Sequence, residues 1–290
     1  MKGEKVKDAL NKKIGFIGAG NIAEAIISGI IKSGIISENI FISDVSKKRL
    51  NYICKKYKVI KCYSNSDVVK YSDIIFLAVK PYQIEGVLEE IKDNFDADFC
   101  QHRFLISVAA GIKTSKIEKY LKQKKVSIVR VMPNIPVLFG EGAIAITAGR
   151  YSKKTDVRFV KKLLSSSPKA NLPGCGMVVV VAEKNMDAVT SVSGSGPAYI
   201  FYIAEIMRYT AEKLGLTKDV SKKLVYQTLF GASKMLVLSD AEPEILRQKV
   251  TSKGGTTEAA FKVLLGEKFG KIFEKAIFAA AKRSEELSNG

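Results

Sequence analysis

Tryptophan is absent from this chain, histidine occurs once, and cysteine occurs only four times among 290 residues. The cysteines are Cys54, Cys62, Cys100 and Cys175. None of them forms a CxxC pair, and the single His102 cannot complete a common zinc site, so we expect no bound metal. One histidine in a polar loop also leaves no Ser/His/Asp or Cys/His set for nucleophilic catalysis. Unpaired thiols are typical of a reducing compartment, and we therefore predict a cytoplasmic protein.

Long apolar runs are missing as well. The sequence has no stretch of about 18 apolar residues, the minimum for a membrane-spanning helix, so we expect no membrane partner. Residues 1–12 are polar, contain acids and lack the apolar core of a signal peptide. We interpret this segment as a flexible leader.

Acidic residues are few relative to basic ones. The chain has 29 Asp and Glu against 47 Lys and Arg, a formal net charge of +18, which raises the hypothesis of nucleic-acid binding. However, the lysines are scattered in pairs such as Lys12-Lys13 and Lys161-Lys162, without a basic block that carries interleaved aromatics. We therefore predict solvated lysine faces and no nucleic-acid partner. The positive field favours anionic small molecules, and nucleotides are anionic.

The remaining composition is that of an ordinary globular protein, with 47% hydrophobic and 26% charged residues, and the length suggests two domains. Short apolar runs alternate with helical patterns in the first half. The predicted strands lie at 14–17, 39–43, 73–79, 104–108 and 127–131, and the predicted helices include 22–32, 47–56 and one opened by Pro81. Strands that alternate with helices indicate an α/β domain built on a parallel sheet.

The second half changes character after the apolar run Val178–Val181. From residue 183 onwards nearly every segment has helical periodicity. The predicted helices lie at 185–191, 197–214, 221–238, 244–251, 257–265 and 268–287. We therefore place the domain boundary near residue 182, with an α/β domain over 13–182 and an all-helical domain over 183–290.

A glycine-rich segment, Gly18–Ala23, reads G-x-G-x-x-A between a predicted strand and a predicted helix. Gly18 permits a tight turn, Gly20 lets the backbone approach a pyrophosphate, and Ala23 allows close packing of the helix on the strand. The N–H groups of Asn21 and Ile22, which open the helix, would face the phosphates. The pattern indicates a dinucleotide site, although a glycine-rich turn in an unrelated α/β protein gives the same letters.

The second predicted strand ends at Ser43-Asp44. An acid at this distance from the glycines usually binds the 2′-hydroxyl of the adenosine ribose, which favours NAD. The basic residues 47–49 follow at once and offer a site for a 2′-phosphate, so these residues leave the choice between NADH and NADPH open. Asp44 is also a candidate cap for the next helix, with Ser46 as the alternative.

Further cofactor contacts are expected where later strands end, because ligands sit beyond the carboxyl ends of parallel strands. The run Ala78-Val79-Lys80 fits this position, and Ala109 and Asn134 are expected beside the nicotinamide. Asn65 fits a contact on the adenosine side or an ordinary turn, and Lys80 fits equally a solvated residue at a helix start. The predicted cofactor-binding residues are Gly18, Gly20, Asn21, Ile22, Ser43, Asp44, Asn65, Ala78, Val79, Lys80, Ala109 and Asn134.

Several segments follow one another along the chain: the glycine loop, 78–81 (AVKP), 107–111 (SVAAG), 130–136 (RVMPNIP), 187–190 (DAVT), 193–199 (SGSGPAY) and 250–257 (VTSKGGTT). Together they make the chain resemble the pyrroline-5-carboxylate reductases from about Lys13 to Arg283, and the last two segments are the most specific. The resemblance implies a Rossmann-type domain followed by a helical dimerisation domain, homodimers that often assemble into decamers, and an active site shared between subunits. It implies reduction of 1-pyrroline-5-carboxylate to L-proline, with NADPH ahead of NADH.

The segment Ser252–Thr257 precedes a predicted helix and combines glycines with hydroxyl side chains. Such a helix start offers N–H donors to a carboxylate, although on residue type alone Thr256 could simply cap the helix. The resemblance implies that Thr257 hydrogen-bonds the imine nitrogen as the catalytic residue. It implies that the substrate carboxylate is held by Ser252, Gly254, Gly255 and Thr256, together with Thr257. Lys253 departs from the proline that the family usually has there, and the role of Asp240 stays open.

Two other classes of function are compatible with a dinucleotide site. A β-hydroxyacid dehydrogenase would need a catalytic lysine after a glycine-rich segment, and 194–199 contains none. A regulatory dinucleotide-binding protein would have no use for the segment Ser252–Thr257. The pattern therefore favours the reductase.

Overall fold

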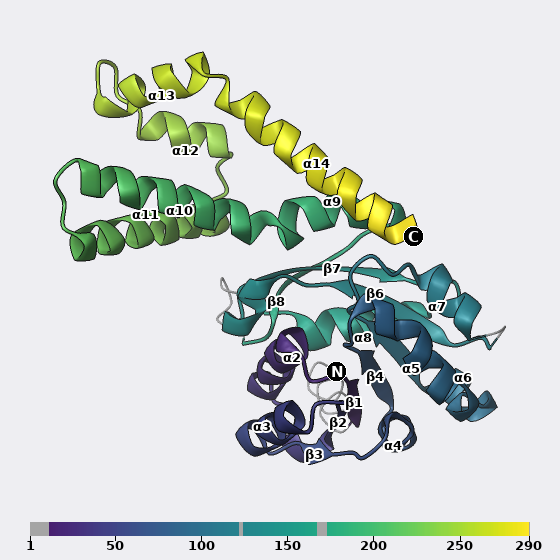
Figure 1. Cartoon of the computed structure of the whole chain (residues 1–290). Helices are drawn as coiled ribbons and strands as arrows, with labels where there is room; N and C mark the ends of the chain where they lie inside the picture. Colours follow the sequence, from purple (N-terminus) through teal and green to yellow (C-terminus); the bar gives the residue numbers. More distant parts are fainter. Residues whose placement is uncertain (1–11, 122–123, 167–172, 290) are drawn as a thin grey trace. The chain divides into compact units, whose positions relative to one another are not determined.

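The computed structural model describes residues 12–121, 124–166 and 173–289, so the predicted leader lies outside the described residues except for its last position. The chain forms two compact units (Figure 1). The first comprises residues up to Gly194 together with Ala281–Gly290, and the second comprises Ser195–Ala280. Residue 182, where the strand pattern ends, lies inside the first unit.

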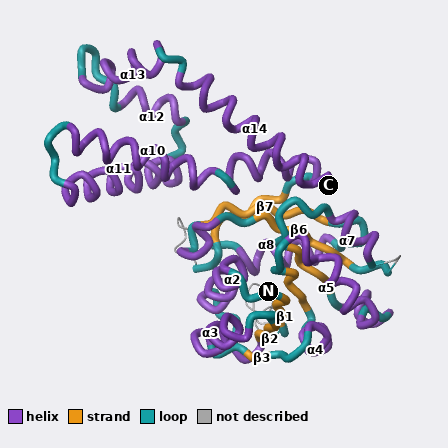
Figure 2. The backbone as a smooth tube through the Cα atoms, viewed as in Figure 1, coloured by secondary structure: helices purple, strands orange, loops and turns teal. Residues whose placement is uncertain are grey.

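The first unit is built on a twisted sheet of eight strands (Figures 1 and 2). The strands are β1 (Ile14–Ile17), β2 (Ile40–Ser43), β3 (Ile60–Lys61), β4 (Ile74–Leu77), β5 (Phe104–Ser107), β6 (Ser127–Met132), β7 (Gly142–Ala148) and β8 (Gly176–Val180). Their order is β3-β2-β1-β4-β5-β6-β7-β8, and all neighbours are parallel except β6 and β7. The predicted α/β class is confirmed.

Helices cover both faces of this sheet. They are α2 (Asn21–Lys32), α3 (Lys47–Tyr57), α4 (Asn65–Tyr71), α5 (Ile84–Ile91), α6 (Ala97–His102), α7 (Thr114–Tyr120) and α8 (Lys154–Leu164), and a short helix, α9 (Met186–Val189), follows β8. Because side chains alternate along a strand, the fully buried strands feed two apolar clusters. Phe16 stacks on Phe76 at 4.6 Å between ring centroids in the cluster with α2, α3 and α8. Ile17 and Leu77 belong to the cluster with α4, α5 and α7.

Strand β7 is the main departure from the expected sheet. Its sequence GAIAITA is rich in small residues and gives a weak strand signal, and it pairs antiparallel with β6. Only residues 133–141 connect the two strands, and a parallel crossover needs a dozen residues or more. The short strand β3 and the helices α4, α6, α7 and α8 were also not predicted, because their segments are short or strongly polar.

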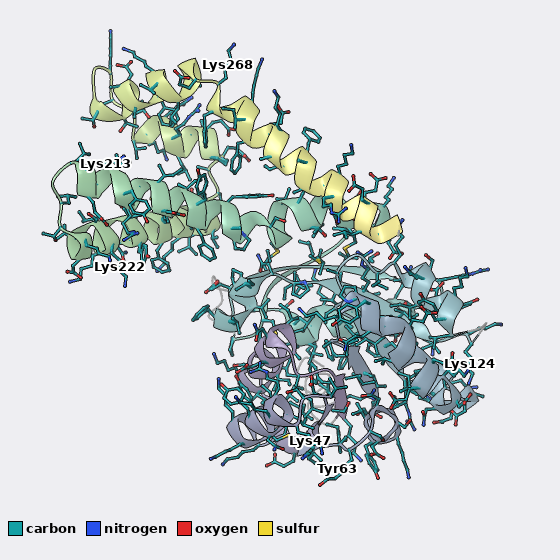
Figure 3. The ribbon with its side chains drawn as sticks, viewed as in Figure 1. Lys47, Tyr63, Lys124, Lys213, Lys222 and Lys268 are labelled. Atoms are coloured by element: carbon teal, nitrogen blue, oxygen red, sulfur yellow. The ribbon has the colours of Figure 1, made fainter. Side chains whose placement is uncertain are left out.

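The second unit is helical. It contains α10 (Gly196–Lys213), α11 (Lys218–Leu238), α12 (Pro243–Lys249), α13 (Thr256–Gly266) and the first part of α14 (Phe269–Asn289). Lysines such as Lys213, Lys222 and Lys268 point outwards from its helices and turns, as expected of solvated faces (Figure 3). Within the described ranges, no helix has the length and apolar character that crossing a bilayer requires.

The last nine residues of α14, 281–289, belong to the first unit. The side chains of Ser284 and Ser288 are only 6% exposed, and both hydroxyls donate to Oδ1 of Asp187, at 2.7 and 3.1 Å. A methyl group on Gly111, whose φ is +73°, would stand 3.4 Å from the carbonyl oxygen of Leu287. The end of the chain therefore packs on the turn after β5 and on the segment after β8.

Candidate active site

A cavity of about 560 Å³ opens at the carboxyl ends of β1, β2, β4 and β5 in the first unit. It is lined by Ile17, Gly18, Gly20, Asn21, Ile22, Asp44, Val45, Asn65, Ala78, Val79, Lys80, Pro81, Gln83, Val87, Val108, Ala109, Ala110 and Ile135. Ten of the twelve predicted cofactor residues are in this set. The structure thus brings together residues that are far apart in the sequence.

The glycine turn has the geometry that a close-approaching ligand needs. Gly18 adopts φ +103°, and a methyl group there would stand 2.6 Å from the carbonyl oxygen of Ala78, so only glycine fits. A methyl group on Gly20 would meet nothing within 4 Å, which leaves its backbone open. Gly20 is also the N-cap of α2 and offers no capping side chain. The first N–H groups of α2 are therefore available to an anion beside the cavity.

Asp44 follows β2 and is held by backbone donors on both sides. Its Oδ2 accepts a hydrogen bond from the N–H of Ala19 at 2.6 Å, and its Oδ1 accepts one from the N–H of Ser46 at 2.7 Å. The helix cap that the sequence left open belongs to Ser46, whose hydroxyl accepts from the N–H of Arg49. The carboxylate of Asp44 instead fixes the glycine turn and lines the cavity.

Arg49, the last residue of the basic segment 47–49, is bound to other groups of the protein. Nε of Arg49 donates to the carbonyl oxygen of Ala19 at 2.6 Å, and its Nη2 pairs with Glu24. Glu24 also accepts from Lys56 and Tyr57. Burial raises the pKa of Glu24, but the hydrogen bonds from Lys56, Arg49 and Tyr57 outweigh it and the net pKa is lowered. Glu24 therefore faces Arg49 as an anion.

Ser43, the last residue of β2, is hydrogen-bonded to Asn65, the first residue of α4. Ser43 is buried, and its hydroxyl donates to Oδ1 of Asn65 at 2.7 Å, while Nδ2 of Asn65 donates to Glu90 at 2.7 Å. Asn65 lines the cavity and Ser43 does not. Ser43 therefore reaches the cavity only through the amide that it holds.

Asn134 is placed away from the cavity lining. Its side chain is nearly buried, with Nδ2 donating to the carbonyl oxygen of Ser193 at 3.0 Å and Oδ1 accepting from the N–H of Ala143 at 2.9 Å. The neighbouring Ile135 lines the cavity instead. The amide thus joins β7 to the π-helical turn Thr190–Gly194.

Sequence reasoning missed eight of the lining residues. They are Ile17, Val45, Pro81, Gln83, Val87, Val108, Ala110 and Ile135. Most of them adjoin a predicted contact, so widening each strand end by one residue would have found them. The other two lie further along the chain. Gln83 ends a 3₁₀ turn over Pro81–Gln83, and Val87 lies in α5, which follows this turn. Periodicity offered no signal for that turn.

The predicted carboxylate loop lies in the second unit, before α13. Gly255 is the N-cap of α13 and makes no side-chain cap, so Thr256 does not cap this helix. Gly254 has φ +72°, and its N–H donates to Oε2 of Glu258 at 2.8 Å. Helix geometry leaves the first N–H groups of α13 without partners inside the helix. Ser252, Gly254 and Thr256 are exposed, whereas Gly255 and Thr257 are half-buried.

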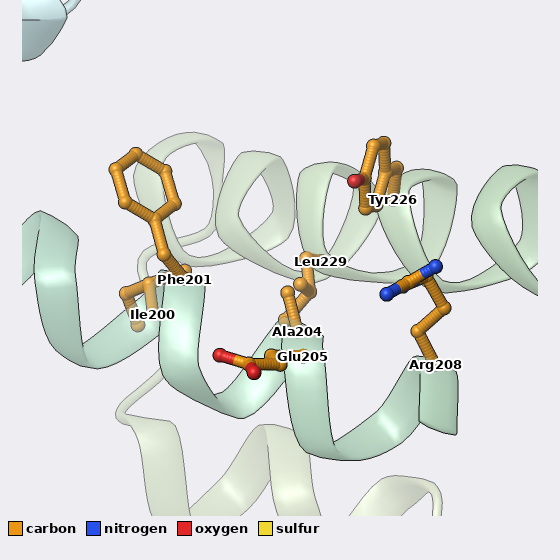
Figure 4. A pocket seen from close by; sticks show the side chains of 7 residues that line it. All are labelled: Ile200, Phe201, Ala204, Glu205, Arg208, Tyr226 and Leu229. Atoms are coloured by element: carbon orange, nitrogen blue, oxygen red, sulfur yellow. The ribbon is translucent and has the colours of Figure 1, made fainter. Parts of the chain in front are cut away.

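A second cavity, of about 520 Å³, lies between α10 and α11 in the second unit (Figure 4). It is lined by Ile200, Phe201, Ala204, Glu205, Arg208, Tyr226 and Leu229. Arg208 pairs with Glu212 rather than with a lining acid. Apolar and aromatic side chains dominate this surface. The residues predicted for substrate or cofactor lie elsewhere.

Two further residues that the sequence singles out, Gly194 and His102, do not line the cavity at the strand ends. Gly194 lies against β6, where a methyl group would come within 2.9 Å of Cε of Met132. The segment from Ser193 to Pro197 thus serves close packing and a helix start, with Pro197 in the first turn of α10. His102 ends α6 and is exposed, so it lies outside both candidate regions.

Comparison with known proteins gives a consistent set of similarities. Residues 183–287 match the family model of pyrroline-5-carboxylate reductase dimerisation, and residues 13–111 match that of NADP oxidoreductase, coenzyme F420-dependent. Pyrroline-5-carboxylate reductase 2 of Bacillus subtilis is 37% identical over 95% of both chains. A solved pyrroline-5-carboxylate reductase from Coxiella burnetii is 37% identical, with a TM-score of 0.86 over 96% of this chain and 98% of the other. The Plasmodium falciparum structure, which has NADP bound, is 32% identical, with a TM-score of 0.81 over 96% and 99%.

Proposed function

The chain belongs to the pyrroline-5-carboxylate reductase family, and we propose on that basis that it reduces 1-pyrroline-5-carboxylate to L-proline, the last step of proline biosynthesis. The observation that carries the proposal is the cavity at the strand ends, which gathers ten separately predicted residues around a glycine turn. A regulatory protein that only binds the dinucleotide would not need the loop Ser252–Thr257 before α13. A hydroxyacid dehydrogenase would need a lysine that the segment 194–199 lacks.

The residues of the cavity fit a nicotinamide dinucleotide. Gly20 leaves space where a methyl group would stand, and the uncapped start of α2 suits a pyrophosphate. Asp44, Val45 and Asn65 would hold the adenosine side, while 78–80 and 108–110 would hold the nicotinamide side. When bound, the dinucleotide supplies the hydride that the imine carbon of the substrate receives, and the imine nitrogen brings its proton as an iminium or takes it from water. The chain contributes position and a water-poor pocket wall.

The loop Ser252–Thr257 would hold the substrate. Its N–H at Gly254 already binds a carboxylate oxygen, that of Glu258, which supports the affinity that we assign to the loop. The N–H groups of Thr256 and Thr257 at the start of α13 would donate hydrogen bonds to the ring carboxylate. The hydroxyl of Thr257 would hydrogen-bond the nitrogen and keep the imine oriented as it becomes an amine. Ser252, Gly254 and Gly255 would complete the cradle.

Replacing Thr257 tests this assignment. We expect Thr257→Ala to lower kcat/KM for the cyclic imine by about 100-fold, because a positioned hydrogen bond at the reacting centre is lost. The measurement is the loss of reduced-nicotinamide absorbance with and without pyrroline-5-carboxylate. Thr155→Ala, which removes an exposed hydroxyl on α8, is the matched control and should leave the rate unchanged. A folded wild-type protein that binds the dinucleotide but does not oxidise it with this substrate would refute the function.

The assembly of the protein can be proposed from its family, and its location from its thiols. The helical unit matches a dimerisation model, and we propose a homodimer that can build a decamer. The free thiols Cys54, Cys62, Cys100 and Cys175 support a cytoplasmic location, because that compartment keeps thiols reduced.

A further inference from the structure

We propose that this chain binds NADH in preference to NADPH, because Asp44 accepts the ribose 2′-hydroxyl and repels a 2′-phosphate. The inference rests on the proposed dinucleotide site and adds the selectivity of that site. The sequence left two possibilities, an acid that favours NADH and a basic segment that favours NADPH. The geometry around β2 distinguishes them.

The carboxylate of Asp44 is fixed at the cavity wall. The N–H groups of Ala19 and Ser46 each bind one of its oxygens, which sets its position and leaves lone pairs on both. A 2′-hydroxyl can donate to such an oxygen without displacing anything. A 2′-phosphate brought to the same place would put two anionic groups in contact.

The cation that could offset this repulsion is already occupied. Arg49 donates to the carbonyl oxygen of Ala19 and pairs with Glu24. Glu24 is 9% exposed and also pairs with Lys56, so a phosphate would have to take Arg49 away from a buried partner. Removing one member of such a pair leaves a buried charge uncompensated, which is costly.

Among the residues that the structure describes, no other basic group lies on the adenosine side of the cavity lining. Of the described residues that line the cavity, only Asp44 and Lys80 carry charge. Lys80 follows β4, which stands on the other side of β1 from β2. Lys47 and Lys48 are exposed on the first turn of α3 and do not line the cavity. Val45, 89% exposed, occupies the lining position beside Asp44.

The test measures dissociation constants of NADH and NADPH directly, by calorimetry, without substrate. We expect wild-type protein to bind NADH at least about tenfold more tightly, the scale of one unfavourable charge contact near a protein surface. Asp44→Asn should bring the two constants to within about threefold of each other. Asp98→Asn, which removes an exposed acid on α6, is the charge-matched control and should keep the wild-type ratio.

A second variant covers the case in which Asp44→Asn disturbs the glycine turn. Val45→Arg places a guanidinium at an exposed lining position and should strengthen NADPH binding about tenfold, whereas Val45→Gln should not. Tighter binding of NADPH by wild-type protein would overturn the inference and leave the reductase function standing. An unchanged ratio in both Asp44→Asn and Val45→Arg would overturn it as well. Failure of both dinucleotides to bind would refute the cofactor site itself, and with it the inference.

Discussion

The two units of this protein bury their apolar residues to very different extents. Strands β1, β2, β4 and β5 are buried at every position, and α2 buries more than half of its residues. Within residues 195–280, all of which the structure describes, α10, α12 and α13 bury none, and α11 buries only Ser221 and Val225. Large apolar side chains such as Phe201, 63% exposed, stand on the surface instead.

The difference shows that the first unit has a core of its own and the second does not. Large apolar surfaces that a folded chain leaves exposed commonly mark contacts with another protein. Residues 183–287 match a model of pyrroline-5-carboxylate reductase dimerisation, which agrees with a role of these helices in assembly. The sheet domain is therefore stabilised by its own packing, whereas we propose that a second copy of the chain covers the exposed apolar side chains of the helices.

The largest effect is expected in the core of the first unit. Phe76→Ala removes a fully buried ring that stacks on Phe16, and should lower the free energy of unfolding by about 3–5 kcal/mol. Urea unfolding followed by circular dichroism measures the change. Tyr63→Ala, at an 88% exposed position of the same unit, should stay within about 0.5 kcal/mol. Similar losses in the two variants would contradict a self-sufficient core.

A charge on the helical surface should act on assembly rather than on the sheet. Phe201→Asp puts a carboxylate on the exposed apolar face of α10 and should weaken the dimer about 100-fold, because an interface anchor is replaced by a charge that must be desolvated. Sedimentation equilibrium measures the change in molecular mass. Tyr63→Asp is the control in the first unit. If Phe201→Asp remained dimeric at low concentration, α10 would be excluded from the interface.

The smallest effect that we expect is the dependence of the free energy of unfolding on pH. It concerns the first unit, which contains all four cysteines. Burial raises the pKa of the Cys175 thiol from 9.0 to about 12. The unfolded chain loses this proton near pH 9 and the folded chain retains it, so the stabilisation is complete below pH 9 and is lost as the pH rises towards 12. Between about pH 8 and pH 10 the free energy of unfolding should fall by about 1 kcal/mol from this group. Cys175→Ala should lose that part of the slope, and an unchanged slope would show that the thiol does not contribute.

Much of the fold could be predicted because local signals agreed with it. The strand β1, the turn at Gly18 and the helix after it combine apolar burial, glycine and helical spacing in one segment. Strand β7 was not predicted, because its alanines and glycine have little preference for strands. Its antiparallel pairing depends on the length of the connection from β6. Such pairing is a property of the chain path, which no local window contains.

The candidate site divides in the same way. Gly20, Asp44 and Ala78 were predicted because each follows a strand, and the cavity includes them. The partners of Arg49 were not predictable, because Glu24 and the carbonyl of Ala19 reach it only through tertiary packing. Asn134 also follows a strand, but its amide is used between β7 and Ser193. A strand end thus indicates where a side chain stands and not what it binds.

The return of α14 to the first unit sets an order on biosynthesis. A ribosome adds about 5–20 residues each second from the amino end, and domains usually fold as they emerge. Here the serines that bind Asp187 lie 97 and 101 residues after it in the sequence, beyond the whole helical unit. Until residues 281–289 are translated, the nascent sheet domain lacks the segment that covers Gly111, so this domain is completed only after the helical unit has been made.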